Sequence, residues 1–286
     1  MIDGLQRITR APPASHRRTP VRHQFLATAA AVTLALGASP AAATPPPTRY
    51  AAIGDSFAAG VGAGSYDKAS GECHRSSRAY PALWAAEHHP AAYLFAACSG
   101  AGTQAVLRDQ LPLVPADSTL VTLTVGGNDL GFADAVIGCL QPFTTDAKCD
   151  AALDESERRL RDELPASLEQ TYRAVSSAAP AARVVVTGYP HLLETGTGCP
   201  VGTDPRRARF NALTDRLDET IERQSAKQGF EFADVRSAFS GHGVCAGGGG
   251  EWVNRFVLSG LWASFHPTDT GQSHGYLPAV SAAVTE

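Results

Sequence analysis

The sequence predicts an α/β protein in which helices cover both faces of a mainly parallel sheet. Short apolar runs rich in strand-forming residues alternate along the chain with amphipathic helical stretches, an order typical of parallel sheets. Glycine or small polar residues follow several of these runs and mark the strand ends. The chain has 286 residues, of which 44% are hydrophobic, and this is enough for one large core.

The first predicted strand is Tyr50–Ile53, which ends at Gly54. Later runs of similar length predict four more strands, at Tyr93–Ala97, Leu120–Val125, Arg183–Thr187 and Phe230–Asp234. Short apolar runs of this kind are typical of strands that are buried on both faces. We therefore expect a single sheet between two layers of helices.

Two stretches carry apolar residues at three- and four-residue steps, from Leu153 to Val175 and from Phe210 to Ile221. This spacing predicts helices with one buried face. Further helices are expected at Tyr80–His88, Thr103–Gln110 and Thr270–Val284. Three segments rich in Gly, Cys or polar residues are predicted to be loops: Gly62–Ser77, Gly138–Lys148 and Gly241–Gly250.

The first 43 residues have the pattern of a secretory signal. Five arginines precede an apolar run from Phe25 to Leu36, and small residues ending in Ala41-Ala42-Ala43 follow it. The run is too short to anchor the chain in a bilayer. General secretion is favoured over twin-arginine export, because Thr19-Pro20-Val21 is a poor continuation of Arg17-Arg18. We expect cleavage near Ala43, a Pro-rich linker over residues 44–48, and a single domain over residues 49–286.

Without residues 1–43 the chain has 19 basic and 27 acidic residues, a net charge of −8. It has no basic patch with interleaved aromatic residues. This argues against nucleic acid as a partner and gives no attraction to anionic membranes. We expect a monomer that acts on a neutral small-molecule or lipid substrate and has no stable membrane anchor.

All six cysteines lie in the predicted mature chain, and an even count in an exported protein predicts disulfides. Several pairings are possible. We favour the sequential one, in which the first two bonds close short loops: Cys73–Cys98, Cys139–Cys149 and Cys199–Cys245. A zinc site is disfavoured because no two cysteines have the close spacing of a zinc knuckle.

A serine follows the first predicted strand, in the run Gly54-Asp55-Ser56-Phe57. This places Ser56 at a strand-to-helix turn, where unpaired N–H groups stabilise negative charge near its oxygen. An acyl-transfer nucleophile requires that environment. Asp and Ser are also ordinary helix caps, so the run alone leaves both interpretations open.

Two other turns offer donors for an oxyanion. Gly126-Gly127-Asn128-Asp129 follows the third strand, so the Asn128 amide can reach a ligand at the sheet edge. Cys98-Ser99-Gly100-Ala101-Gly102 follows the second strand, and we favour the N–H of Gly100 over that of Gly102. Small residues of this kind are also common turn residues, so neither run is decisive by itself.

A late histidine completes the set. His266 lies in Ser264-Phe265-His266-Pro267, on a loop that leads into the last predicted helix. Functional groups of parallel sheets gather at the carboxyl ends of the strands, so this loop can bring His266 close to the serine. Imidazole is the commonest general base in proteins. The other histidines of the mature chain have weaker contexts.

Together, the Gly-Asp-Ser run, Gly100, the Gly-Gly-Asn-Asp run and the late His-Pro resemble the four blocks of the SGNH (GDSL-type) hydrolase family. The similarity spans roughly residues 49–283 and is strongest to the secreted actinobacterial esterase, lipase and phospholipase branch. It implies a flavodoxin-like three-layer α/β/α fold and carboxylic ester hydrolysis through an acyl-enzyme, with no metal or organic cofactor. It also implies that Ser56 is the nucleophile and His266 the base, and that Ser56, Gly100 and Asn128 form the oxyanion hole.

The sequence departs from the common family pattern at one position. The family usually has an aspartate three residues before the histidine, and this chain has Ala263 there. Some members of the branch orient the imidazole with a backbone carbonyl instead. The sequence therefore predicts a Ser–His dyad oriented by the carbonyl of Ala263 or Ser264, with Asp269 as the alternative.

Five aromatic residues are candidates for an acyl pocket, although aromatics at such spacings more often belong to the core: Phe57, Trp84, Phe132, Phe143 and Trp262. An esterase or lipase is the favoured function. Two alternatives stay open at this point. One is a carbohydrate acetylesterase on the same scaffold. The other is a secreted binding domain without turnover, for which the missing aspartate is the only support.

Overall fold

A computed structural model describes residues 47–285 except 142 and 197. The expected signal peptide and the linker residues 44–46 lie outside the described residues. The core of the described part is a five-stranded sheet in the order β2-β1-β3-β4-β5, in which every pair of neighbours is parallel. Its strands are β1 (Arg49–Gly54), β2 (Ala92–Phe95), β3 (Leu120–Thr124), β4 (Arg183–Thr187) and β5 (Glu231–Ala233).

The five strands lie where the sequence predicts them, with ends that differ by at most two residues. Strand β3 is buried at every position, and β1 and β4 are buried at all positions but the first. Their apolar side chains pack against helices above and below the sheet. The predicted parallel α/β architecture is confirmed.

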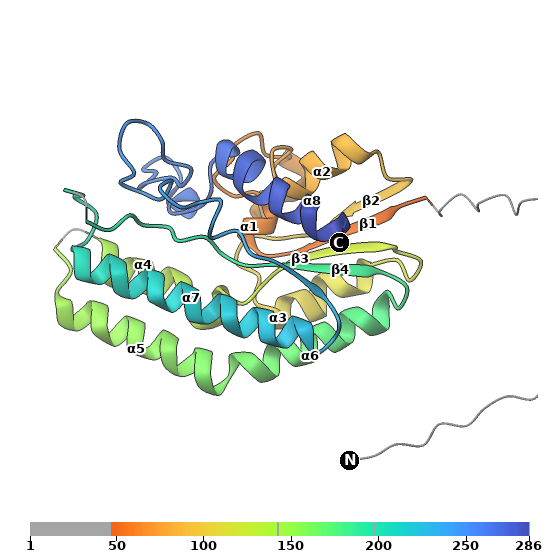
Figure 1. Ribbon diagram of the computed structural model, residues 1–286, viewed down its shortest axis with the longest axis horizontal. Helices are drawn as coiled ribbons and strands as arrows, with labels where there is room; N and C mark the ends of the chain where they lie inside the picture. Colours follow the sequence, from red (N-terminus) through yellow and green to blue (C-terminus); the bar gives the residue numbers. More distant parts are fainter. Residues whose placement is uncertain (1–46, 142, 197, 286) are drawn as a thin grey trace, which may run out of the picture. The chain divides into compact units, whose positions relative to one another are not determined.

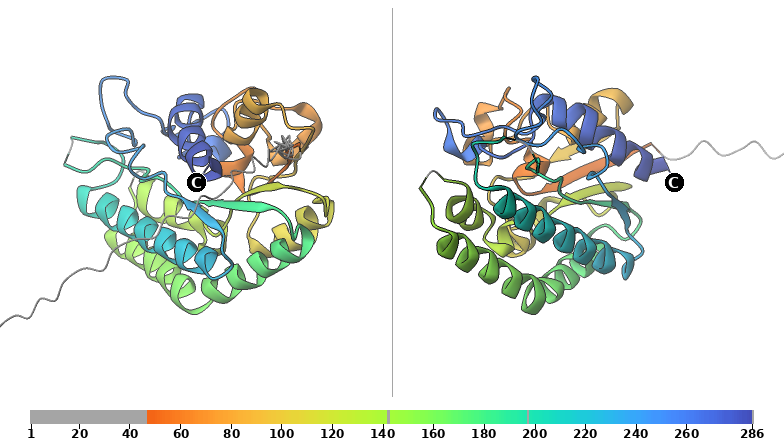
Figure 2. Two further views of the ribbon diagram at one scale, coloured as in Figure 1. Left: turned by 45° about the vertical axis from the view of Figure 1, so that its right-hand side comes forward. Right: turned by 60° about the vertical axis from the view of Figure 1, so that its left-hand side comes forward.

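Helices cover the sheet on both faces (Figures 1 and 2). One face carries α1 (Ser56–Ala59), α2 (Tyr80–His88) and α8 (Leu277–Thr285). The other carries α3 (Thr103–Ala105), α4 (Phe132–Leu140), α6 (Leu164–Ala178) and α7 (Asp204–Ala226), with α5 (Asp146–Asp162) packed outside them. Within the described residues, no helix combines the length and apolar character needed to cross a bilayer.

One helix that the sequence predicts is divided into two in the structure. The apolar spacing from Leu153 to Val175 predicts one helix, but the structure has two, α5 and α6, which meet at Glu163. Pro165 is the reason. Proline has no N–H to donate to the carbonyl of Arg161, and its ring crowds that carbonyl, so α5 ends and the backbone leaves the helical conformation at Glu163.

The predicted loop Gly138–Lys148 is shorter than expected, because α4 extends to Leu140 and α5 begins at Asp146. The Thr145 side chain accepts from the N–H of Lys148 and so caps α5 early. Helix α4 was missed, although its buried Ala135, Val136 and Cys139 have helical spacing. As a result, Cys139–Cys149 joins two helices.

The register of β1 and β3 brings two of the predicted turns together. Gly54 pairs with Thr124 at the carboxyl ends of these strands, and the N–H of Asp55 donates to the Thr124 carbonyl at 2.9 Å. A β-carbon on Gly54 would lie 2.4 Å from that carbonyl oxygen, so this close approach requires glycine. Ser56 and the Gly126–Asn128 turn therefore leave the sheet side by side.

Candidate active site

Ser56 begins helix α1, one residue beyond the end of β1, and is 6% exposed. The preceding Asp55 caps the helix, because its carboxylate accepts from the N–H of Phe57 at 2.9 Å. Within the described part of the chain, the N–H of Ser56 has no hydrogen-bond partner. This leaves a backbone donor beside the serine hydroxyl, as the sequence predicts for this turn.

His266 contacts Ser56 directly. Its Nε2 lies 2.8 Å from Ser56 Oγ, and its Nδ1 lies 2.9 Å from the carbonyl oxygen of Ser264. A carbonyl only accepts, so Nδ1 carries the proton and Nε2 accepts from the serine hydroxyl. Burial lowers the pKa of His266 to about 4. The imidazole is therefore neutral over a wide pH range and is able to take a proton from Ser56.

The group that orients the imidazole is the Ser264 carbonyl, one of the options that the sequence leaves open. Asp269, the alternative, lies elsewhere. Its carboxylate forms a half-exposed ion pair with Arg78 at 3.0 Å and accepts from the N–H of Thr270. The Ala263 carbonyl, the other backbone option, makes no hydrogen bond to His266 among the described residues.

A residue outside every predicted motif, Asn254, holds the His266 backbone in position. Asn254 donates from its N–H and its Nδ2 to the His266 carbonyl, at 2.9 and 3.1 Å. The same Nδ2 donates to the carbonyl of Gly62, in the loop after α1. Gly62 has a φ of +95°, and a β-carbon there would lie 2.9 Å from His266 Cβ. No local motif reveals Asn254, because its partners are far away in the sequence.

Gly100 and Asn128 border the same cavity as Ser56 and His266. Asn128 Nδ2 donates to the Ala101 carbonyl at 3.0 Å, which fixes the amide and leaves its second hydrogen for a ligand. Among the described residues, nothing accepts from the N–H of Gly100. Gly102 does not border the cavity and instead faces the Asp129 carboxylate, which favours Gly100 as the donor.

The cavity has a volume of about 290 Å³ and runs from the Ser–His pair between α4 and the segment 256–266. Its walls are mainly apolar: Phe132, Ala133, Val136 and Ile137 on α4, with Phe256, Leu261 and Trp262 opposite. Trp262 stacks on His74 with ring centroids 3.8 Å apart. An extended apolar chain would fit this lining better than a charged or sugar group.

Two of the five aromatic residues expected to line the pocket do so, Phe132 and Trp262. Phe57 is buried behind His266, with ring centroids 5.1 Å apart. Trp84, on α2, packs against Tyr50 near the amino end of β1 and is not part of the cavity. Phe143 is fully exposed. For Phe57, Trp84 and Phe143 the pocket interpretation is wrong, because aromatic character alone does not tell core from surface or from pocket.

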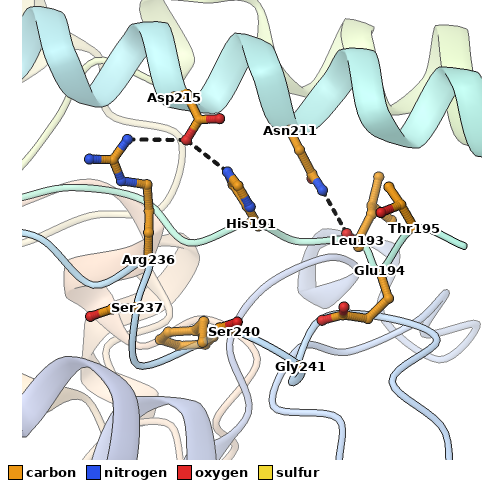
Figure 3. Close-up of a pocket in the computed structure, with 11 residues that line it drawn as sticks. His191, Leu193, Glu194, Thr195, Asn211, Asp215, Arg236, Ser237, Ser240 and Gly241 are labelled. Atoms are coloured by element: carbon orange, nitrogen blue, oxygen red, sulfur yellow. Dashed lines mark hydrogen bonds and ion pairs between the residues drawn. The ribbon is translucent and has the colours of Figure 1, made fainter.

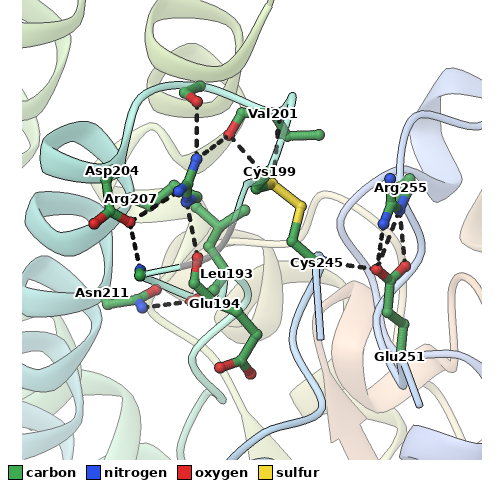
Figure 4. Close-up of a disulfide and its surroundings, with 12 residues drawn as sticks. Leu193, Glu194, Cys199, Val201, Asp204, Arg207, Asn211, Cys245, Glu251 and Arg255 are labelled. Atoms are coloured by element: carbon green, nitrogen blue, oxygen red, sulfur yellow. Dashed lines mark hydrogen bonds and ion pairs between the residues drawn. A yellow bond between two sulfur atoms is a disulfide. The ribbon is translucent and has the colours of Figure 1, made fainter. Parts of the chain in front are cut away.

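The structure has three disulfides, and they are the sequential pairs Cys73–Cys98, Cys139–Cys149 and Cys199–Cys245. The first lies next to the Gly100 turn, where the N–H of Ser99 donates to the Cys73 carbonyl. The third ties the segment after β4 to the Gly-rich segment 241–250 (Figure 4).

Beside the third disulfide, the buried Arg207 holds one loop in place. It donates to the carbonyls of Glu194, Val201 and Gly202 and to the Asp204 carboxylate, all within 3.1 Å (Figure 4). These contacts satisfy backbone carbonyls of the 193–204 loop. Their role is structural.

A second cavity lies beyond β4 and β5 and is polar (Figure 3). Its lining includes His191, Asn211, Asp215 and Arg236, and the Asp215 carboxylate accepts from both His191 and Arg236. None of the residues predicted for catalysis borders it. In the described parts of the chain, no group of three or more His, Cys, Asp or Glu side chains is arranged to hold a metal ion.

Comparison with known proteins agrees with the geometry. The profile of the GDSL-like Lipase/Acylhydrolase family matches residues 52–274. Curated relatives include a lipase of Streptomyces rimosus, 44% identical over 86% of this chain and 91% of its own length. Lipase 1 of Streptomyces coelicolor is 41% identical over 90% of this chain and 94% of its own length.

Solved structures give the same result. The extracellular lipase of Streptomyces rimosus matches with a TM-score of 0.78 and 44% identity, over 82% of this chain and 99% of that one. Phospholipase A1 of Streptomyces albidoflavus NA297 matches with a TM-score of 0.79 and 40% identity, over 83% of this chain and all of that one. The resemblance found in the sequence is confirmed: the chain belongs to the GDSL-like lipase/acylhydrolase family of serine ester hydrolases.

Proposed function

We propose that this protein hydrolyses carboxylic esters through an acyl-enzyme, with Ser56 as nucleophile and His266 as general base. The observation that carries the proposal is the 2.8 Å contact between Ser56 Oγ and His266 Nε2, in a pocket that also contains Gly100 and Asn128. A nucleophile, a base and convergent donors at one cavity are the requirements of acyl transfer.

In the first half of the reaction, His266 takes the proton of Ser56 while Oγ attacks the ester carbonyl carbon. The carbonyl oxygen becomes an oxyanion that accepts from the N–H groups of Ser56 and Gly100 and from Asn128 Nδ2. When the C–O bond to the alcohol breaks, the protonated His266 donates its proton to the leaving oxygen. The alcohol departs, and the acyl group stays on Ser56.

In the second half, a water molecule gives a proton to His266 and attacks the acyl carbon. Collapse of the second tetrahedral intermediate breaks the bond to Ser56 Oγ, which regains its proton from His266 as the acid leaves. The Ser264 carbonyl holds the imidazole in the correct tautomer throughout. A neutral carbonyl stabilises the imidazolium less than a carboxylate does.

We propose a lipid ester as the substrate, with the acyl chain along α4. The apolar cavity favours this over a carbohydrate acetylesterase, whose alcohol portion would need polar partners. Exposed apolar side chains also lie on the two segments that form the cavity: Ile137, Leu261 and Trp262 border it, and Phe143 and Leu258 lie within a few residues of them in the sequence. Similar proteins named lipase and phospholipase A1 agree with this substrate class.

We also infer that the protein is exported as a monomer after removal of residues 1–43. The pattern of that segment and three disulfides fit an oxidising compartment, and the similar Streptomyces rimosus lipase is extracellular. Expression of the full chain in a Streptomyces host should give a protein in the medium whose sequence begins near Thr44. Light scattering then gives its mass.

The test is hydrolysis of p-nitrophenyl esters from acetate to palmitate by the oxidised protein beside Ser56→Ala. We expect activity that peaks at medium or long chains and is lost in the variant. An optimum at acetate would favour the acetylesterase. If no ester is turned over and a fluorophosphonate does not label Ser56, the protein is a binding domain and the proposal is wrong.

A further inference from the structure

A buried tyrosine, Tyr189, connects the turn that contains Ser56 to the turn that contains Asn128. The hydroxyl oxygen of Tyr189 accepts from the N–H of Gly127 at 3.0 Å, and the hydroxyl donates to Asp55 Oδ2 at 2.6 Å. The other oxygen of Asp55 accepts from the N–H of Phe57, next to Ser56. One phenol therefore connects the residue before Ser56 to the residue before Asn128.

This connection is closed to water. Tyr189 is 5% exposed and Asp55 is 1% exposed, so no solvent can replace a lost hydrogen bond without rearrangement. The tyrosine ring packs edge-on against Phe57, with centroids 5.0 Å apart. It also lies against Gly127, where a β-carbon would be 3.3 Å from Tyr189 Cζ.

Tyr189 itself is held from a third strand. It lies two residues after β4, and its backbone N–H donates to the buried carboxylate of Asp218 on α7 at 2.9 Å. The backbone of Tyr189 is therefore held independently of the two turns that its hydroxyl contacts. A group held in this way can set the distance between the two turns.

We propose that Tyr189 is a positioning residue for the reaction, which fixes Asn128 relative to Ser56 by holding Gly127 and Asp55 at one hydroxyl. This rests on the proposed function, because it requires Ser56 as nucleophile and Asn128 as oxyanion donor. Oxyanion donors act only when they lie within about 2.7–3.1 Å of the developing charge. A misplacement of about 1 Å can cost on the order of 100-fold in rate.

Tyr189→Phe removes the hydroxyl and keeps the ring. We expect kcat for a soluble p-nitrophenyl ester to fall about 10- to 100-fold while KM changes less than about 2-fold, because the acyl pocket is untouched. The matched control is Tyr172→Phe, another fully buried tyrosine, whose hydroxyl has no partner among the described residues. Its kcat should equal that of the unmodified protein.

A second measurement separates positioning from general loss of stability. If Tyr189 acts through Asn128, the two substitutions are not additive. Tyr189→Phe should therefore cost less than about 3-fold in an Asn128→Ala background. A full and independent loss in that background, with an equal fall in thermal stability, would mean that the tyrosine is only structural and would overturn the proposal.

Ser56→Ala and Asn128→Ala, measured in parallel, distinguish a failure of the proposed function from a failure of the role proposed for Tyr189. If these variants keep full activity, the proposed function fails. If they lose activity while Tyr189→Phe keeps its kcat, the proposed function stands and the role of Tyr189 is wrong.

Discussion

Two histidines of this protein follow the sheet on its carboxyl side, and they have opposite surroundings. His266 is 8% exposed, contacts a serine hydroxyl, and has a backbone carbonyl as its other partner. The side chain of His191 is 39% exposed, and its partner is the Asp215 carboxylate at 2.8 Å (Figure 3). One has a nucleophile and no carboxylate, and the other has a carboxylate and no nucleophile.

A His–Asp pair is therefore not by itself a sign of catalysis. Ser237 and Ser240 border the same cavity as His191, but within the described residues neither donates to its ring. Asp215 is shared with Arg236, so its charge is already partnered. Around His266 the neighbours are the Phe57 and Phe132 rings, which exclude water and keep the imidazole neutral.

The largest expected effect comes from exchanging the two histidines for alanine. His266→Ala should lower kcat/KM by at least about 10⁴-fold, the usual scale for losing a member of such a catalytic unit. His191→Ala should change kcat/KM by less than about 2-fold. The measurement is steady-state hydrolysis of a soluble ester by both variants. Equal losses would show that the two cavities are coupled and would break the comparison.

Each cavity also contains an asparagine that donates to a backbone carbonyl, Asn128 to Ala101 and Asn211 to Leu193. Asn128→Ala should lower kcat by about 100- to 1000-fold, because an oxyanion donor is lost. Asn211→Ala, the matched control, should leave kcat unchanged. Near-normal turnover in Asn128→Ala would remove this residue from the mechanism.

What the sequence could predict follows from how local each signal is. Short stretches of the sequence are enough to predict the sheet, the Ser56 turn, the Asn128 turn and the His266 loop. In the structure the two turns and the loop meet at the carboxyl edge of the sheet. Tyr189 and Asn254 could not be found in this way, since each acts on residues distant in the sequence. The pocket assignments of Phe57, Trp84 and Phe143 failed because hydrophobicity does not specify which surface a side chain faces.

The protonation of His266 should make the unfolding free energy depend on pH. Its pKa falls from 6.5 in the unfolded chain to about 4 in the folded one, so the unfolded chain binds more protons between these values. Stability from the neutral imidazole is therefore complete above pH 6.5 and is lost as the pH falls toward 4. Relative to His266→Gln, the unmodified protein should lose about 2 kcal/mol of unfolding free energy between pH 7 and pH 5.

Urea unfolding at several pH values measures this, and the other titrating groups cancel in the difference. Between pH 7 and pH 8 the difference between the two proteins should stay constant. A constant difference down to pH 5 would mean that His266 is hydrated in the folded protein, and the contrast with the solvated His191 would disappear.

The smallest expected effect concerns the rims of the two cavities. Of the seven exposed large apolar side chains among the described residues, five lie on or next to the two segments that form the His266 cavity, and among these five Leu258 is 89% exposed and Phe143 fully so. Neither borders the cavity itself. The double variant Leu258→Ser and Phe143→Ser should bind vesicles of ether-linked phosphatidylcholine about tenfold more weakly, since burying such side chains contributes about 1.5–3 kcal/mol each at most. Hydrolysis of p-nitrophenyl acetate should not change.

Leu113→Ser is the control for that experiment, because Leu113 is 57% exposed but lies on a different segment, after α3. Its vesicle binding should equal that of the unmodified protein. Ether lipids resist ester hydrolysis, so cosedimentation reports binding alone and does not depend on Ser56. If all three proteins bind equally, the rim does not contact lipid, and the apolar walls of the cavity alone select the substrate.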